Sequence, residues 1–112
     1  MFMKKEIDYR LDDVARHWDN LIPIMVAEET GELLKCISKY ERFMAKVSDL
    51  TYDDSSGYED RRLNEEESEI MTNIEKEVAD VMIIIGAMLR HYGLDEVAID
   101  QYVKEKLNKT YD

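Results

Sequence analysis

Residues 27–35 read AEETGELLK and place three glutamates in a segment with the spacing of an amphipathic helix. With successive residues about 100° apart on a helical wheel, Glu29 lies at the centre of the apolar stripe and Glu32 lies about 60° to one side. Glu28 lies farther round the same side, nearer to solvent. Because an ionised carboxylate is costly to bury without a partner, the sequence predicts that these acids bind a cation.

A second segment, EKEVADVMIII at residues 75–85, carries the same arrangement. Glu77 lies at the centre of an apolar stripe. Asp80 lies about 60° from Glu77 around the helix, on the same side as Glu32 lies from Glu29. If the two stripes face each other, four carboxylates converge and repel one another strongly. Lys and Arg are absent from both stripes near these acids, apart from Lys35 and Lys39 toward a helix flank, so divalent ions are the expected counter-charge. The predicted metal ligands are Glu29, Glu32, Glu77 and Asp80.

The expected metal is Mg²⁺, with Mn²⁺ as the alternative, because both accept ligand sets made only of oxygen and zinc prefers nitrogen and sulfur. A single E-x-x-E in a charged helix is more often a surface salt bridge or a solvated pair. Glu66 and Glu69 form such a pair in a polar setting and are not expected to bind metal. The repetition on two stripe centres is what favours a metal site.

The apolar spacing predicts four helices and no strand, and hence an all-α fold. The expected helices cover about residues 5–18, 21–47, 65–92 and 96–108 of a single domain, residues 1–112. Pro23 falls in the first turn of the second helix, where proline is tolerated, and Gly93 is expected to end the third. The acidic, polar segment at about residues 48–64 is expected to be a loop insertion that acts as a lid or as an oligomer contact.

The segment VADVMIIIGAML at residues 78–89 is apolar nearly all round. A helix of this kind must be covered on more than one side. In a chain of 112 residues, the expected cover includes another subunit, so the protein is predicted to be a homo-oligomer.

The composition narrows the classes of partner and the compartment. A formal net charge of −11 argues against nucleic acid and against an anionic membrane as partners. The chain has one cysteine, Cys36, so it forms no internal disulfide and suits a reducing compartment. The longest apolar run is too short to cross a bilayer, and the first residues do not form a signal peptide. These features predict a soluble, cytoplasmic protein.

Taken together, EETGELLKCISK and EKEVADVMIII resemble the MazG-like nucleotide pyrophosphohydrolases, which are all-α enzymes related to the dimeric dUTPases. The family pattern is E-x-x-E on one helix and E-x-x-D on another. In this chain the pattern falls on Glu29 with Glu32 and on Glu77 with Asp80. The resemblance covers about residues 22–111. The 44 residues from 33 to 76 make the spacing between the two motifs longer than is usual in the family, which bears on substrate specificity more than on the metal site.

The resemblance implies a four-helix bundle, completed as a homodimer or homotetramer, that acts on nucleoside triphosphates. The family hydrolyses the bond between the α and β phosphates and releases a nucleoside monophosphate and pyrophosphate. Metal ions held by the carboxylates would neutralise the phosphates and lower the pKa of the attacking water. Glu32 or Glu28 would then accept the proton, beside the metal ligand Glu29, and the sequence does not choose between them.

The end of the chain, KEKLNKTYD, resembles a tail segment that contacts phosphates in relatives. Its cations equally suit the C-terminal end of a helix, where they complement the helix dipole. A tryptophan could stack on the base, although a tryptophan at helical spacing is more often part of a core. The predicted substrate-binding residues are therefore Trp18, Lys39, Lys104, Lys106, Asn108 and Lys109.

The leading alternative is not an enzyme but an acidic helical protein that mimics DNA or binds a basic partner. This alternative predicts acids spread over exposed helix faces and an affinity for a basic protein that falls with salt. A third hypothesis, an inactive relative kept as a structural subunit, is disfavoured by the intact set of four acids.

Overall fold

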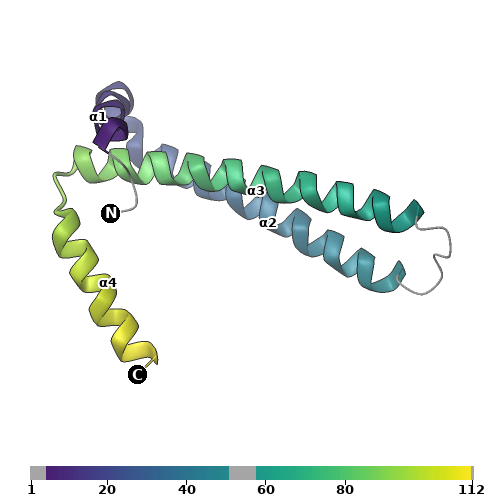
Figure 1. The fold of residues 1–112 in the computed structure, drawn as a ribbon. Helices are drawn as coiled ribbons and strands as arrows, with labels where there is room; N and C mark the ends of the chain where they lie inside the picture. Colours follow the sequence, from purple (N-terminus) through teal and green to yellow (C-terminus); the bar gives the residue numbers. More distant parts are fainter. Residues whose placement is uncertain (1–4, 51–57, 112) are drawn as a thin grey trace. The chain divides into compact units, whose positions relative to one another are not determined.

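The computed structural model describes residues 5–50 and 58–111. All the regular secondary structure in these residues is helical, and none of it is strand. The all-α fold class predicted from the sequence is therefore confirmed. No helix in these residues is long and apolar enough to cross a membrane. The elements in Figure 1 are α1 (Lys5–Trp18), a 3₁₀ turn (Asp19–Leu21), α2 (Ile22–Leu50), α3 (Tyr58–His91) and α4 (Glu96–Tyr111).

Two helices extend into the segment that was expected to be a loop over residues 48–64. α2 continues to Leu50, and α3 begins at Tyr58 rather than near residue 65. Residues 61–64, in the first turns of α3, read RRLN. Arginine and leucine are good helix formers, so this polar stretch can form helix without an apolar stripe. The predicted lid or oligomer contact falls largely on residues 51–57, outside the described part of the chain.

The junction between α3 and α4 follows from two local signals. Gly93 has a φ of +65°, a left-handed conformation that glycine adopts without a steric penalty. The backbone N–H groups of Gly93 and Leu94 donate to the carbonyl oxygens of Arg90 and Leu89 at 3.2 and 2.8 Å, which is a Schellman motif. The side chain of Asp95 then accepts from two backbone N–H groups of the first turn of α4 at 2.9 and 3.3 Å. Both helix ends predicted here are confirmed.

The chain divides into two compact units, and the first consists of Met1–Ile24 with Ile83–Asp112. Within this unit Nε of Arg90 lies 3.1 Å from a carboxylate oxygen of Asp12, and Glu96 lies 3.7 Å from another guanidinium nitrogen. Arg90 therefore ties α3 to α1 and α4. The buried apolar side chains of the unit are Leu11, Ala15, Ile22, Ile84, Ala87 and Leu89.

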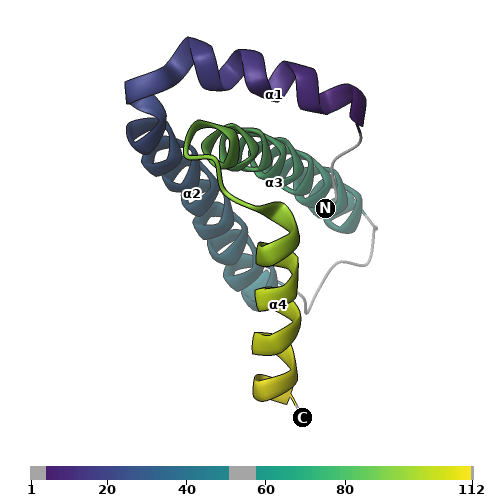
Figure 2. The same ribbon diagram turned by 90° about the vertical axis from the view of Figure 1, so that its left-hand side faces the viewer.

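The second unit, Met25–Met82, is a hairpin of two long helices. Within it α2 and α3 run antiparallel and side by side, as Figures 1 and 2 both show. Phe43 on α2 and Ile70 on α3 are buried, at 5% and 4% exposure. Four other residues on the face of α2 that carries Glu29 are only half-buried, namely Leu33, Cys36, Tyr40 and Val47. The hairpin is thus held by a narrow apolar seam, and the candidate site lies along this seam.

Candidate metal centre

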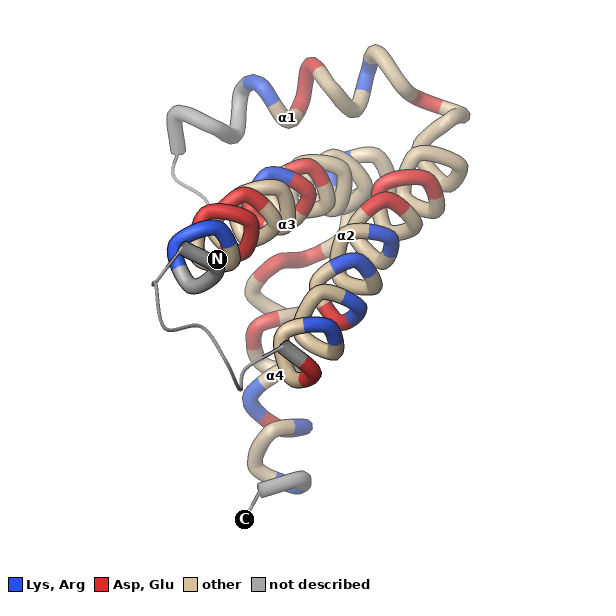
Figure 3. The backbone as a smooth tube through the Cα atoms, turned by 90° about the vertical axis from the view of Figure 1, so that its right-hand side faces the viewer, with Lys and Arg blue, Asp and Glu red and all other residues tan. Residues whose placement is uncertain are grey.

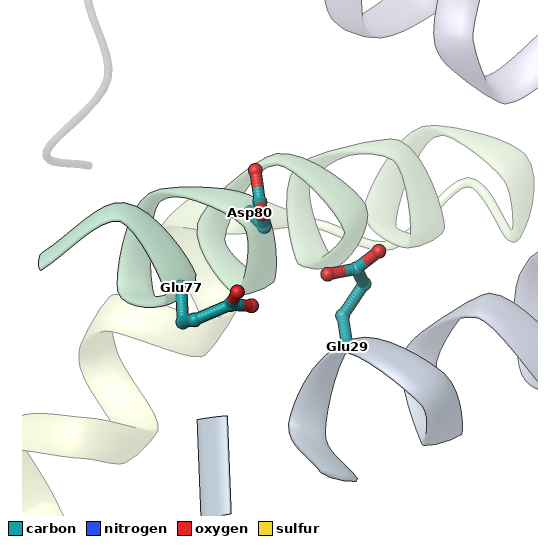
Figure 4. A group of neighbouring side chains, drawn as sticks. All are labelled: Glu29, Glu77 and Asp80. Carbon is teal, nitrogen blue, oxygen red and sulfur yellow. The ribbon is translucent and has the colours of Figure 1, made fainter. Parts of the chain in front are cut away.

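Three of the four predicted metal ligands come together in the hairpin. Glu29 projects from α2, and Glu77 and Asp80 project from α3 (Figure 4). Each residue offers one carboxylate oxygen, and these oxygens lie within 4.8 Å of one another. An ion with Mg–O bonds of 2.0 to 2.1 Å separates opposite ligand oxygens by about 4.2 Å, so small side-chain rotations would complete the coordination.

The local sequence explains how the acids reach one another. Glu77 and Asp80 are three residues apart, which puts them on the same face of α3, one turn apart. Glu29 lies at the centre of the apolar stripe of α2, so it points toward the seam. Glu29 and Glu77 are half-buried, whereas Asp80 is exposed. The group is therefore accessible to solvent at least at Asp80.

Glu32, the fourth predicted ligand, lies outside this group. Its side chain is 53% exposed, and its Oε1 lies 3.4 Å from Nζ of Lys35 on the same helix. Its offset of about 60° from the stripe centre carries it toward the flank of α2. Exposed ion pairs of this kind contribute little to stability, so the pair leaves Glu32 able to change rotamer. Glu28 is also exposed.

Glu29 is an acid of the centre whose pKa is shifted. Its pKa is raised above the ordinary value, first because partial burial disfavours the charged form. The negative charges of Asp80, Glu77, Glu28 and Glu32 raise the pKa further, in that order. At neutral pH the centre therefore gains from a bound proton or a bound cation.

The raised pKa predicts how the metal-free protein responds to pH. A group whose pKa is higher in the folded than in the unfolded state contributes stability at low pH and loses it as pH rises through the folded pKa. We expect Glu29→Gln, which removes the ionisation, to raise the melting temperature at pH 8 in EDTA by about 2 to 4 °C and to lose this advantage near pH 4. Thermal unfolding followed by circular dichroism measures both values.

The matched control is Glu41→Gln, which removes one charge from an exposed position of the same helix. An equal gain at pH 8 in the control would assign the effect to the net charge of −11 and not to the cluster.

A cleft of about 260 Å³ opens beside the acidic group and has Glu77 in its wall. Lys39, predicted to contact substrate, lines the same cleft, together with Asn73 and Lys76. Asn73 and Lys76 are not among the residues predicted from the sequence. Asn73 precedes Glu77 by four residues and therefore shares its face of α3, so the spacing could have identified it.

The other predicted substrate-binding residues belong to the other unit of the chain. Trp18 is half-buried there, and its ring meets that of His17 edge to face, with centroids 5.0 Å apart. The side chains predicted to contact phosphate on α4 are exposed, and their contact with substrate stays a prediction: Lys104, Lys106, Asn108 and Lys109.

Comparison of the chain with protein-family models, with curated proteins and with solved structures gives no match. The resemblance to the MazG-like enzymes therefore depends on the residues of the two motifs alone.

Proposed function

We propose that the protein is a Mg²⁺-dependent nucleoside triphosphate pyrophosphohydrolase. The observation that supports this proposal most is the approach of Glu29, Glu77 and Asp80, with one oxygen of each within 4.8 Å of the others. These are acids at the positions of the E-x-x-E and E-x-x-D motifs, and they come from two helices. Since every donor is a carboxylate oxygen, the group fits a hard divalent cation.

In the proposed mechanism, Glu29, Glu77 and Asp80 would hold Mg²⁺, with Mn²⁺ as the alternative. The chemistry that the ion would supply is neutralisation of the phosphate charge and a lower pKa for a water molecule. Glu32 or Glu28, both exposed beside the centre on α2, accepts the proton of the attacking water. The water oxygen bonds to the α-phosphorus, the bond from that phosphorus to the α–β bridging oxygen breaks, and pyrophosphate leaves with the electron pair.

The proposal is tested by incubating the protein with Mg²⁺ and a panel of ribo- and deoxynucleoside triphosphates and identifying the products. Nucleoside monophosphate with pyrophosphate is the expected result. Diphosphate with inorganic phosphate would place the cleavage at the wrong bond. If no nucleotide of the panel is hydrolysed, the proposal that the protein is a nucleotide-hydrolysing enzyme is refuted.

The burial of the acids weighs against the non-enzymatic alternative. A protein that binds a basic partner through its charge needs acids on exposed faces. Several acids of α3 are exposed, including Glu65 and Glu69, but Glu29 and Glu77 are half-buried against the seam. Half-buried acids are poorly placed to meet a partner's surface and well placed to hold an ion.

We further propose that the helices form part of a four-helix bundle completed by a second copy of the chain, in the cytoplasm. Apolar side chains remain exposed along the hairpin, most of all Leu34 at 63%, with Ile37, Met44, Met71 and Val78 between 37% and 40%. A second subunit that covers them would gain about 25 cal/mol for each Å² buried. Sedimentation equilibrium is expected to give a mass two or four times 13.2 kDa. A single-chain mass at micromolar concentration would exclude this assembly.

A further inference from the structure

A second hollow, of about 430 Å³, adjoins the cleft beside Glu77. Lys39 and Ile70 line both hollows, so the two lie next to each other along the hairpin. The second hollow adds Arg42 and Lys46 from α2. We call the two adjoining hollows together the basic groove and define it by its four cations, Lys39, Arg42, Lys46 and Lys76.

The basic groove is unusual in a chain with a net charge of −11. Lys39, Arg42 and Lys46, with Lys35 one turn before them, fall within an arc of about 60° on α2, so the cations form one stripe. Figure 3 shows Lys and Arg recurring turn after turn along this helix. Among the described residues, none of the groove's four cations has a carboxylate partner in an ion pair. Their charge is available to an anionic ligand.

The second hollow also has apolar walls and one acid. Phe43 and Ile70, which line it, are the buried side chains of the hairpin seam. Glu66 is the acid of this hollow and faces three cations, Lys39, Arg42 and Lys46. The balance of charge along the hollow therefore favours an anion.

The groove begins at the metal centre and is longer than a triphosphate needs. Lys39 and Lys76 share a cleft with Glu77, so they can reach phosphates next to the reacting one. Lys46 lies seven residues beyond Lys39, which is about 10 Å farther along the helix axis. An anion that contacts the metal centre and also Arg42 and Lys46 must therefore be an extended chain of charges.

We propose that the basic groove binds the leaving phosphate chain of the substrate, and that the preferred substrates are nucleotides with more than three phosphates. This inference depends on the proposed function for its reaction. With a nucleoside tetraphosphate, water bonds to the α-phosphorus, the bond to the α–β bridging oxygen breaks, and the products are a nucleoside monophosphate and tripolyphosphate. The groove holds the tripolyphosphate half of the substrate.

Binding is tested without catalysis by calorimetric titration with inorganic tripolyphosphate in EDTA, where the metal centre takes no part. We expect Arg42→Gln/Lys46→Gln to weaken binding about tenfold, because two charge-assisted contacts are lost. Glu66→Gln is expected to tighten binding about threefold, because a repelling carboxylate is removed. Raised salt should weaken binding to the wild-type protein.

The control is Arg10→Gln/Arg16→Gln, which removes the same charge from exposed positions of α1. Equal weakening of tripolyphosphate binding in this control, or no binding by the wild-type protein, would overturn the inference that the basic groove binds a phosphate chain. Because any charged surface gives opposite signs for the removal of cations and of an acid, the difference from the α1 control is what assigns the effect to the groove.

Kinetic measurements test the inference about the basic groove separately from the proposed function. We expect the wild-type protein to favour a nucleoside 5′-tetraphosphate over the triphosphate of the same base by about tenfold in kcat/KM, and Arg42→Gln/Lys46→Gln to lose that preference. Hydrolysis of triphosphates without such a preference would overturn the inference and leave the proposed function intact. If no nucleotide is hydrolysed, the proposed function and the substrate class fail together, and the titration alone decides whether the groove binds phosphate chains.

Discussion

Glu77→Gln is expected to lower kcat/KM for nucleotide hydrolysis about a thousandfold, since a metal ion's charge stabilisation is worth several kcal/mol. Glutamine keeps the size and one oxygen of the side chain but lacks the negative charge that balances a divalent cation. Glu77 is half-buried and one of its oxygens lies within 4.8 Å of those of Glu29 and Asp80, so no other carboxylate of the group can replace it without moving. Single-substrate kinetics with Mg²⁺ measures the change.

The control for this experiment is Glu75→Gln. Glu75 precedes Glu77 by two residues on α3, is exposed, and lies outside the acidic group. It is expected to retain activity within about threefold, as surface substitutions away from special features change little. Helical circular dichroism should be the same in both variants. Full activity in Glu77→Gln would remove this residue from the site, and equal loss in both variants would indicate a general effect of charge on the helix.

The helix ends that the sequence predicted correctly are those with a chemical signal of their own. Gly93 ends α3 because of its left-handed backbone, and Asp95 begins α4 by capping it. The acidic segment near residues 48–64 carries no such signal. Its flanks form helix in a largely polar sequence, which gives no apolar periodicity from which a helix could be predicted.

The composition of the acidic group could be predicted only in part from the sequence. A helical wheel gives the direction of each side chain from its own axis, and this was sufficient for Glu29, Glu77 and Asp80. It does not give the distance to the neighbouring helix, so it did not separate Glu32, which lies at the flank beside Lys35. Asn73 and Lys76 line the cleft with Lys39 only through the register of α2 against α3. That register depends on the seam of Phe43 and Ile70, which no single-helix pattern contains.

Mg²⁺ is expected to raise the melting temperature of the wild-type protein by about 10 °C when its concentration is a hundred times its dissociation constant. The metal-free centre has three carboxylates in proximity and a raised pKa at Glu29, so it is repulsive at neutral pH. If a divalent ion binds the folded arrangement and not the unfolded chain, as proposed, linkage converts its binding free energy into stability. Thermal unfolding across a Mg²⁺ titration, with EDTA as the zero point, gives the shift.

The stabilisation must be separated from general screening of a chain that carries 26 acidic residues. NaCl at matched ionic strength screens exposed charges equally and should give only a small rise. Glu29→Gln should lose most of the Mg²⁺ response, whereas Glu41→Gln on the same helix should keep it. A Mg²⁺ response that survives Glu29→Gln, or that NaCl reproduces, would mean that the three acids repel one another without binding an ion. Because burial, and then the neighbouring acids, raise the pKa of Glu29, a bound Mg²⁺ is expected to stabilise the charge of this acid most.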